Sequence, residues 1–484
     1  MKKISSFIIL LVALLLTSCS NDDYRNVIPS DASIVVGVNL GSLAEKSDIE
    51  HSKYMHLFQA SLSTIVPNDE LDDVRELIDR PEKIGLDLTA PVYFFGTAGN
   101  QIGLVAKVAD HDDVEDFVDM LHDLDVASRP KEKSGVTECT LIDEVLCLYT
   151  DRAFLLYVDQ TSQSKEAARK LATQLLNQGA DDSFANTENF DRMEEASADI
   201  SYYVSADIIS KSKKSLVPER TSKDSWLNDL FVIGSLTFDS GRALMVNNIL
   251  PLNEADKAKM DEFVLKHLRP IEGRYLKMQN GPSLVWGCLG VEGQWLLDEC
   301  LKDNKDIKGT LFMLERCVDI EQMLRSVDGD ITFSIGNFIF SEPNISAMAR
   351  VKETKFLSDV DYWQKSMKDY GMSMDRLSDN DYVVHLGDGK RLYWGVNDKD
   401  LYMSNIGRPT LDSDQWSSLA DDIKSSYFYL VADLQQIGDM IDEEELAFLK
   451  SLDKLMFKIK SSTELDIEVT SQNKEENILK TLLR

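Results

Sequence analysis

Pro91-Val92-Tyr93-Phe94-Phe95 is followed by a turn at Gly99-Asn100 and then by Ile102-Gly103-Leu104-Val105-Ala106-Lys107-Val108. Both apolar runs are rich in β-branched and aromatic residues, which are typical of strands. Glycine and asparagine between two such runs favour a tight reversal of the chain. This stretch therefore predicts an antiparallel β-hairpin as the basic element of the fold.

The same succession of elements occurs again in the second half of the chain. Its matching hairpin runs from Asp330 to Val351. The matched segments are 32–40 with 282–289, 91–108 with 330–351, 145–157 with 391–403, 201–208 with 426–434, and 231–250 with 455–469. Such self-similarity predicts an internal duplication, with a chance succession of strands and helices as the alternative.

One helix is expected after each of the two hairpins, because apolar residues recur there at helical spacing. These residues are Val114, Phe117, Val118 and Leu121 in the first half, and Phe356, Val360, Trp363 and Met367 in the second. Asp112 or Asp113 is placed to cap the first helix. A further helix is expected only in the first half, from a Ser164 cap to Asn177 and Gly179.

These patterns predict an α+β fold of two tandem related modules, each an antiparallel β-sheet with helices packed on one face. The 484 residues are long enough for two to four structural units. We expect the first module at 28–275 and the second at 276–484, with the boundary in the charged, turn-forming stretch 266–281.

The first 18 residues have the features of a signal peptide. Lys2 and Lys3 precede an apolar run, Phe7 to Leu16, that spans only about 15 Å as a helix and is too short to cross a membrane. Leu16-Thr17-Ser18-Cys19 looks like a lipobox, the bacterial signal for lipid attachment to cysteine. This motif implies acylation at Cys19, a linker over 19–27, and a membrane partner bound through the acyl chains.

The expected location is the cell envelope, as an outer membrane lipoprotein. Ser20 beside Cys19 does not resemble an inner-membrane retention signal. Asp22-Asp23 resembles an export signal to the cell surface, but solubilising linker residues would look the same, so the protein is either periplasm-facing or surface-exposed. The formal net charge of −31 argues against nucleic acid as a partner.

The remaining cysteines give no clear chemical signal. They are Cys139, Cys147, Cys288, Cys300 and Cys317, an odd number without a Cys-x-x-Cys motif. Cys139 and Cys147 lie in neighbouring apolar segments and either pair across a hairpin or act as small buried apolar residues.

The sequence singles out no catalytic, cofactor-binding or metal-binding residues. It contains no nucleophile elbow, phosphate loop or dinucleotide fingerprint, and its six histidines form no metal motif. Asp388-Gly389 is interpreted as a hairpin turn. Asp303-Asn304-Lys305-Asp306 resembles a calcium loop, but Lys305 occupies a ligand position and no glutamate closes it.

A family resemblance rests on longer motifs. Pro81 to Phe94, Ile28 to Leu40, Val318 to Glu321 and Asp328 to Ile331 together resemble a family of bacterial lipoproteins, domain of unknown function family 4836. The resemblance extends over nearly all of the chain after Cys19. It implies lipid anchoring and an envelope location, and it implies no catalytic residues.

We therefore expect a non-enzymatic, lipid-anchored binding or scaffolding protein with an unknown protein or glycan ligand. The alternative is a hydrolase or cation-dependent enzyme acting on envelope or glycan substrates. Its dispersed acids would include Asp87, Asp112 or Asp330.

Overall fold

The computed structural model describes residues 23–49, 71–161, 164–212, 230–301, 318–337, 343–441 and 444–483. The chain divides into two compact units. Unit 1 comprises the chain up to Ile208 together with Ile233–Thr237 and Leu483–Arg484, and unit 2 comprises Ile209–Val232 and Phe238–Leu482. In the described part of the chain, no helix combines the length and apolar character needed to cross a membrane.

Unit 1 is built on an eight-stranded sheet in the order β8–β1–β2–β3–β7–β6–β5–β4, in which all neighbours are antiparallel. The strands are β1 (Ala32–Val38), β2 (Val92–Thr97), β3 (Gln101–Lys107), β4 (Lys131–Lys133), β5 (Val136–Thr140), β6 (Leu146–Tyr149), β7 (Ala153–Asp159) and β8 (Ile200–Val204). The predicted hairpin is confirmed as β2 and β3, with Tyr93 opposite Val105.

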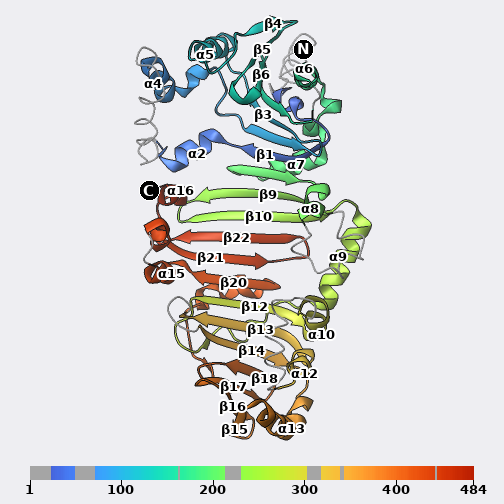
Figure 1. Ribbon diagram of the computed structural model, residues 1–484, viewed down its shortest axis with the longest axis vertical. Coiled ribbons are helices and arrows are strands. Elements are labelled where there is room, and N and C mark those ends of the chain that lie inside the picture. The colour runs from blue at the N-terminus through green and yellow to red at the C-terminus, as the bar shows by residue number, and fades with distance from the viewer. Residues whose placement is uncertain are drawn as a thin grey trace, which may run out of the picture. The chain divides into compact units, whose positions relative to one another are not determined.

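Most helices of unit 1 lie in the connections between these strands, and η1 precedes β1 (Figure 1). They are η1 (Asp23–Val27), α2 (Leu40–Ser47), α4 (Leu71–Asp79), η3 (Pro81–Ile84), α5 (His111–Asp123), η4 (Ile142–Glu144), α6 (Lys165–Asn177), η5 (Ala180–Asp182), η6 (Phe184–Asn186) and α7 (Glu188–Glu195); α8 (Ala206–Ser212) follows β8. The expected helix with a Ser164 cap is confirmed as α6, because the Ser164 side chain accepts from the Ala167 N–H.

Two details of the expected arrangement are corrected. Asp110, rather than Asp112 or Asp113, caps α5, because its extended backbone lets the side chain accept from both of their N–H groups. Helices also cover both faces of the central strands. Ala106 packs on one face with α5, while its strand neighbour Val105 is fully buried on the other face. Both η1 and α6 also contact the central strands. If helices covered only the α5 face, Val105 would be exposed to solvent.

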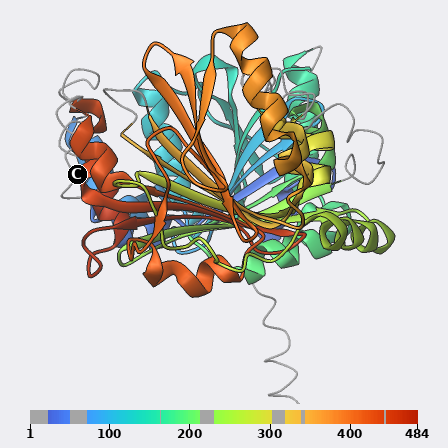
Figure 2. The ribbon, with the colours of Figure 1, turned by 90° about the horizontal axis from the view of Figure 1, so that it is seen from below.

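Unit 2 is built on an eleven-stranded antiparallel sheet in the order β10–β22–β21–β20–β12–β13–β14–β18–β17–β16–β15. Figure 1 shows most of these strands side by side, and in Figure 2 the orange strands are rotated relative to the red ones, as expected for a twisted sheet. The strands are β10 (Arg242–Pro251), β12 (Val285–Glu292), β13 (Val327–Gly336), β14 (Asn344–Val351), β15 (Ser373–Arg376), β16 (Asp381–Gly387), β17 (Lys390–Asn397), β18 (Asp400–Ser404), β20 (Phe428–Asp433), β21 (Leu452–Ile459) and β22 (Glu464–Ser471); β11 (Met278–Gln279) and β19 (Thr410–Leu411) pair separately, and β9 (Leu230–Asp239) is divided between the units.

The helices of unit 2 include the second predicted stripe. Phe356, Val360, Trp363 and Met367 are all buried in one core cluster, on consecutive short helices. The helices are α9 (Glu254–His267), α10 (Gly293–Trp295), η10 (Leu296–Leu301), α12 (Ile320–Arg325), η11 (Lys355–Asp359), α13 (Val360–Ser366), η12 (Met367–Tyr370), η13 (Ser417–Leu419), α14 (Ala420–Lys424), α15 (Leu434–Met440), η14 (Glu444–Ser451) and α16 (Ile478–Leu482). The Asp388-Gly389 turn is confirmed, with φ of 49° and 78°.

The eight strands of unit 1 and eight strands of unit 2 follow the same order. β8–β1–β2–β3–β7–β6–β5–β4 corresponds element by element to β20–β12–β13–β14–β18–β17–β16–β15. The compact units do not follow the expected module ranges 28–275 and 276–484. Because β10 hydrogen-bonds to β22, residues from Phe238 onward pack with the C-terminal strands. The module ranges remain a prediction about the repeat.

Candidate functional site

The candidate site is a cavity of about 240 Å³ in unit 1, which we call the unit 1 pocket. Its lining comes from the ends of β1 and β8, the residue before β2, and the end of α7 with the turn that follows. The lining residues are Gly37, Asn39, Pro91, Met193, Glu194, Ser197, Ala198 and Ser201. Glu194 is the charged group among them.

Small residues on two adjacent strands form the floor of the pocket. Gly37 faces Ser201 on one side and Tyr93 on the other. A Cβ atom at Gly37 would lie 2.9 Å from the Tyr93 ring and 3.1 Å from Oγ of Ser201, so the ring packs against the bare backbone. Any larger residue at this position would push into the pocket or displace Tyr93.

Asp199 fixes one wall of the pocket. Its carboxylate is almost fully buried and accepts hydrogen bonds from Ser42 Oγ at 2.5 Å and from Lys46 Nζ at 2.7 Å. Its main-chain oxygen accepts from the Asn39 N–H at 2.9 Å. Asn39 in turn caps α2 through its side chain, which accepts from the Ser42 N–H. These hydrogen bonds connect the segment just before β8 to α2.

The polar groups around Glu194 create an uneven electrostatic environment. Arg25 lies 3.7 Å from Glu194, and its guanidinium sits over the rings of Tyr24 and Phe190. Burial, together with nearby Tyr24 and Glu194, raises the pKa of Tyr93 well above its usual value. The buried Tyr93 hydroxyl interacts with the Glu194 carboxylate. A neutral phenol beside a carboxylate therefore lies under the pocket floor.

The size of the pocket limits what it can hold. Pockets for drug-sized ligands usually exceed about 300 Å³. The unit 1 pocket suits a ligand of one or two amino-acid residues, or another molecule of that size.

Strand pairing identifies the equivalent place in unit 2. Gly37 pairs with Tyr93 and Ser201, and Cys288 pairs with Thr332 and Tyr429, all six being buried on the corresponding strands. Pro91 precedes Tyr93 by two residues, as Asp330 precedes Thr332. The Asn39 N–H bonds to Asp199 just as the Gly290 N–H bonds to Tyr427. The corresponding pairs are thus Gly37 with Cys288, Asn39 with Gly290, Pro91 with Asp330, Ala198 with Ser426, and Ser201 with Tyr429.

In unit 2 this place is filled by the chain itself, through residues 269–274. The Arg269 N–H bonds to the Gly290 carbonyl oxygen at 2.8 Å, and the Ile271 N–H bonds to that of Ser426 at 2.9 Å. The Ile271 side chain is buried in a core cluster with Trp286, Cys288, Trp416, Ile423 and Tyr429. A stretch of peptide from the chain itself therefore occupies the unit 2 counterpart of the pocket.

Asp330 holds this stretch in place. Its buried carboxylate accepts from the N–H groups of Glu272 at 2.9 Å and Arg274 at 3.1 Å. Burial raises the pKa of Asp330, and these main-chain donors offset part of that effect. Asp330 thus has a structural role, and the alternative assignment of this acid to catalysis finds no reacting partner in these contacts.

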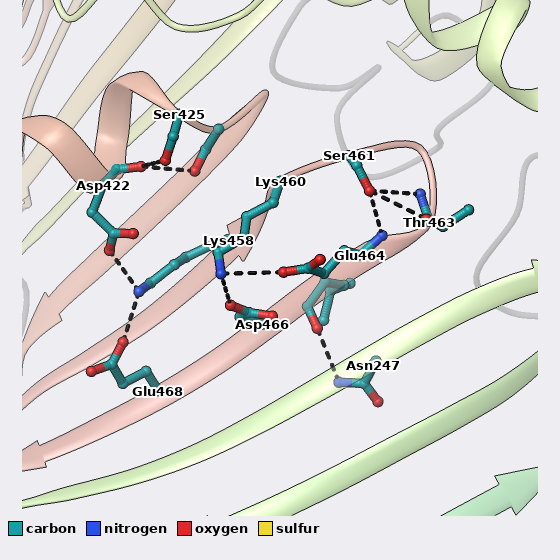
Figure 3. Close-up of polar contacts among 12 residues, drawn as sticks. Asn247, Asp422, Ser425, Lys458, Lys460, Ser461, Thr463, Glu464, Asp466 and Glu468 are labelled. Atoms are coloured by element: carbon teal, nitrogen blue, oxygen red, sulfur yellow. Dashed lines mark hydrogen bonds and ion pairs between the residues drawn. The ribbon is translucent and has the colours of Figure 1, made fainter. Parts of the chain in front are cut away.

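A second polar cluster in unit 2 connects α14 to β21 and β22 (Figure 3). Lys458 is 5% exposed and lies 2.6 Å from Asp422 and 2.7 Å from Glu468. Burial alone would lower the pKa of Lys458, but the two carboxylates raise it above its ordinary value. Lys460 lies 2.6 Å from the buried Asp466. A lysine held protonated in this way is a cross-link between elements rather than a nucleophile.

The other acids considered from the sequence also have local partners. Asp87 accepts from the Thr89 hydroxyl and lies 3.0 Å from Lys107, and these contacts lower its pKa. Asp112 lies in the first turn of α5. The predicted lipid attachment residue Cys19, the signal peptide, and the Asp303 to Asp306 loop lie outside the described residues. No group of three or more metal-ligating side chains occurs in the described ranges.

Cysteine and histidine side chains add no reactive centre to the pocket. Cys139 and Cys147 are free, buried and directly opposite each other on β5 and β6. Cys288 is free and buried, and burial raises the pKa of its thiol. His267 stacks on Trp295 with its pKa lowered by burial. His111, near Asp151, starts α5.

Fold and site together define an antiparallel α+β protein with a small polar pocket in its first unit. The chain belongs to the family described as Domain of unknown function (DUF4836), whose model matches residues 24–478. This match confirms the family resemblance found in the sequence. No curated protein matches the chain, and no solved structure matches it.

The residues of the pocket were not found from the sequence. Glu194 lies at the end of a short helix with no motif and Ser197 follows that helix, while Gly37 and Pro91 resemble ordinary residues of a strand and its start. The sequence match places Ser201 with Ser426, whereas the strand register places it at the position of Tyr429 in unit 2, so the sequence carried no signal for the pocket.

Proposed function

We propose that the protein is a lipid-anchored envelope protein, acylated at Cys19, whose unit 1 pocket binds a small ligand without chemical conversion. The observation that carries the proposal is the pocket itself, a preformed cavity of about 240 Å³ with one half-buried carboxylate. Preformed concave sites with a few placed polar groups are the usual form of small-ligand sites.

The lining chemistry supports binding. The side chains that line the pocket offer hydroxyls, a carboxamide and a carboxylate, and they include neither an imidazole nor a thiol. The carboxamide of Asn39 is already engaged in capping α2. These groups orient a ligand by hydrogen bonds, whereas a nucleophilic mechanism needs a base within reach of the attacking group.

Lipid anchoring is proposed from the signal sequence and the lipobox, and from the bacterial lipoprotein family that the motifs resemble. An outer membrane location, facing the periplasm or the cell surface, follows from the absence of an inner-membrane retention residue after Cys19. Labelling of cells with a radioactive fatty acid tests it: Cys19→Ala should abolish the label and release the protein from membranes, while Ser20→Ala should retain both. A labelled Cys19→Ala protein would refute the anchor.

We also propose that the two eight-stranded sheets are copies of one duplicated module. Identical strand order and matching register at corresponding buried residues support this. The two copies then differ at one place, which residues 269–274 fill in unit 2 and which is open in unit 1.

A thermal-shift screen of the purified protein against peptides, glycans, lipids and divalent cations tests ligand binding. A ligand at about 100 times its dissociation constant stabilises the folded state by about 2.7 kcal/mol. Ser201→Tyr, which introduces the residue found at the unit 2 position, should abolish the shift. Glu194→Gln should weaken it, and the exposed neighbour Glu195→Gln should leave it unchanged. Hydrolysis of a ligand by the unchanged protein, lost in Ser201→Tyr, would instead support the enzyme alternative.

A further inference from the structure

We infer that the ligand of the unit 1 pocket is a short extended peptide segment from another protein, with an aliphatic side chain inserted against Gly37 and Ser201. The inference rests on the proposed binding function of the pocket and names its ligand class. It comes from the occupant of the corresponding place in unit 2, which is visible in atomic detail.

The positions that line the pocket are the positions that hold the peptide in unit 2. The counterparts of Asn39 and Ala198 are Gly290 and Ser426, whose carbonyl oxygens accept from Arg269 and Ile271. The counterpart of Pro91 is Asp330, which accepts from two further N–H groups of the same stretch. In unit 1 the Asn39 carbonyl oxygen already accepts from the Leu43 N–H at 3.0 Å, which leaves the Ala198 carbonyl oxygen to receive a peptide N–H. The pocket thus lies at the place where unit 2 holds a peptide main chain.

The side-chain space follows the same correspondence. In unit 2, Ile271 packs on Cys288 and Tyr429. The equivalent residues of unit 1 are Gly37 and Ser201, which are smaller. The Tyr93 ring takes part of the space at Gly37, and the unit 1 pocket borders both Gly37 and Ser201. An aliphatic residue from a bound peptide would fill this volume and bury about as much apolar surface as Ile271 does in unit 2.

The carboxylate that would accept hydrogen bonds from the peptide comes from a different position in unit 1 than in unit 2. Proline at 91 cannot supply the carboxylate that Asp330 supplies in unit 2, and the Pro91 carbonyl oxygen already accepts from the Tyr24 hydroxyl at 2.9 Å. Glu194, at the end of α7, brings a carboxylate to the pocket from the other side. We assign Glu194 the role of accepting main-chain N–H groups of the bound peptide, which favours peptides without acidic side chains at that point.

The probe is a synthetic peptide with blocked ends and the sequence of residues 268–275, Leu-Arg-Pro-Ile-Glu-Gly-Arg-Tyr, together with a version in which its glutamate is replaced by alanine. Binding to the purified protein is measured by calorimetric titration. The alanine version should bind, and tighter than the native sequence because Glu194 no longer faces a like charge. Replacing the isoleucine of the peptide by aspartate (Ile271→Asp) should weaken binding by about tenfold or more.

Variants of the protein locate the binding. Ser201→Tyr should abolish binding of the alanine peptide, and Glu194→Gln should weaken it about tenfold or more, the loss expected for one hydrogen bond to a charged group. Glu195→Gln should bind as the unchanged protein does. Because Glu194→Gln changes neither size nor packing, it remains informative if Ser201→Tyr does not fold.

Two outcomes would overturn the inference while leaving the proposed function in place. One is a glycan, lipid or cation that binds in a Ser201-dependent and Glu194-dependent way while the peptides do not. The other is a chain beginning at residue 23 that binds the peptide at least tenfold tighter than a chain beginning at residue 19, which would make residues 19–22 the natural occupant. If no ligand of any class depends on Ser201, the proposed function fails as well.

Discussion

The ammonium nitrogen of Lys46 lies 2.7 Å from Oδ1 and 2.8 Å from Oδ2 of Asp199, a carboxylate whose side chain is only 2% exposed. This contact joins α2 to the segment that forms one wall of the unit 1 pocket. It has the short, two-oxygen geometry of a strong charge-assisted hydrogen bond.

Asp199→Ala should lower the free energy of unfolding by about 2 kcal/mol, because hydrogen bonds to charged groups contribute about 1.5–3 kcal/mol and Lys46 can still reach water. Urea unfolding measures the change. A double-mutant cycle with Lys46→Met should show coupling between the two sites. Glu45→Ala, at an exposed position on the same helix, should change stability little; an equal loss there would argue against a specific contact.

The pKa of Lys458 predicts how stability changes at alkaline pH. Its folded-state pKa lies above the unfolded value of 10.5, so its contribution is complete below pH 10.5 and is lost as the pH rises through the folded value. Lys458→Met should cost about 3 kcal/mol at pH 7, since it leaves two partly buried carboxylates unpaired. The difference from the unchanged protein should shrink above pH 10.5.

Urea unfolding at a series of pH values tests this behaviour. Lys450→Met, at an exposed site, is the matched control and should show no pH-dependent difference. A Lys458→Met loss that stays constant to high pH would mean that packing of the side chain, rather than its charge, stabilises the fold.

The opposed thiols of Cys139 and Cys147 should form a disulfide with oxidised glutathione. A hydrogen bond to Cys147 lowers the pKa of Cys139, and the same hydrogen bond and burial raise that of Cys147, so Cys139 supplies the thiolate. The protein loses two protons and two electrons, which reduce the glutathione disulfide to two molecules of glutathione. Closing so short a loop should add about 2 kcal/mol of stability.

Peptide mapping by mass spectrometry detects the expected product, a cross-link between the Cys139 and Cys147 peptides. Cys288 should stay reduced because burial raises the pKa of its thiol. A protein in which Cys288 reacts first would show that the β5–β6 pair is less accessible than its register indicates.

Gly290 occupies a position that should not tolerate a side chain. A Cβ atom there would lie 1.9 Å from the Arg269 carbonyl oxygen, so Gly290→Ala should displace residues 269–274 and cost about 3 kcal/mol. Gly179→Ala is the control, because its Cβ meets nothing within 4 Å and its φ is −88°. Thermal unfolding of the two variants should differ clearly, and equal melting temperatures would contradict the close approach.

Much of the fold could be predicted from alternation of apolar residues and from turn residues. The hairpin around Gly99-Asn100, the Asp388-Gly389 turn and the Ser164-capped helix are all present. The strands β4 and β15 were missed because Lys131–Lys133 is exposed and charged, and Ser373–Arg376 has Met374 as its one apolar residue, so neither shows an apolar alternation to detect. Their pairing is determined by the neighbouring strand rather than by their own residues.

The site could not be predicted, for a different physical reason. A pocket is space that the surrounding side chains leave unfilled, and no single residue in the sequence encodes such space. Among the described residues of unit 1, the space beside Gly37 and Ser201 is open at the place where Ile271 packs in unit 2. That comparison requires the register of three adjacent strands, which sequence pattern leaves uncertain by one or more residues.

The terminal strands β4 and β15 have a consequence for behaviour in a crowded solution. Each offers only three or four residues of unpaired backbone, and those residues include Lys131, Glu132, Lys133, Asp375 and Arg376. A neighbouring molecule that tried to extend either sheet would have to strip water from these charges for very few new hydrogen bonds. At high local density the molecules should therefore remain separate at these edges and resist growth into fibrils.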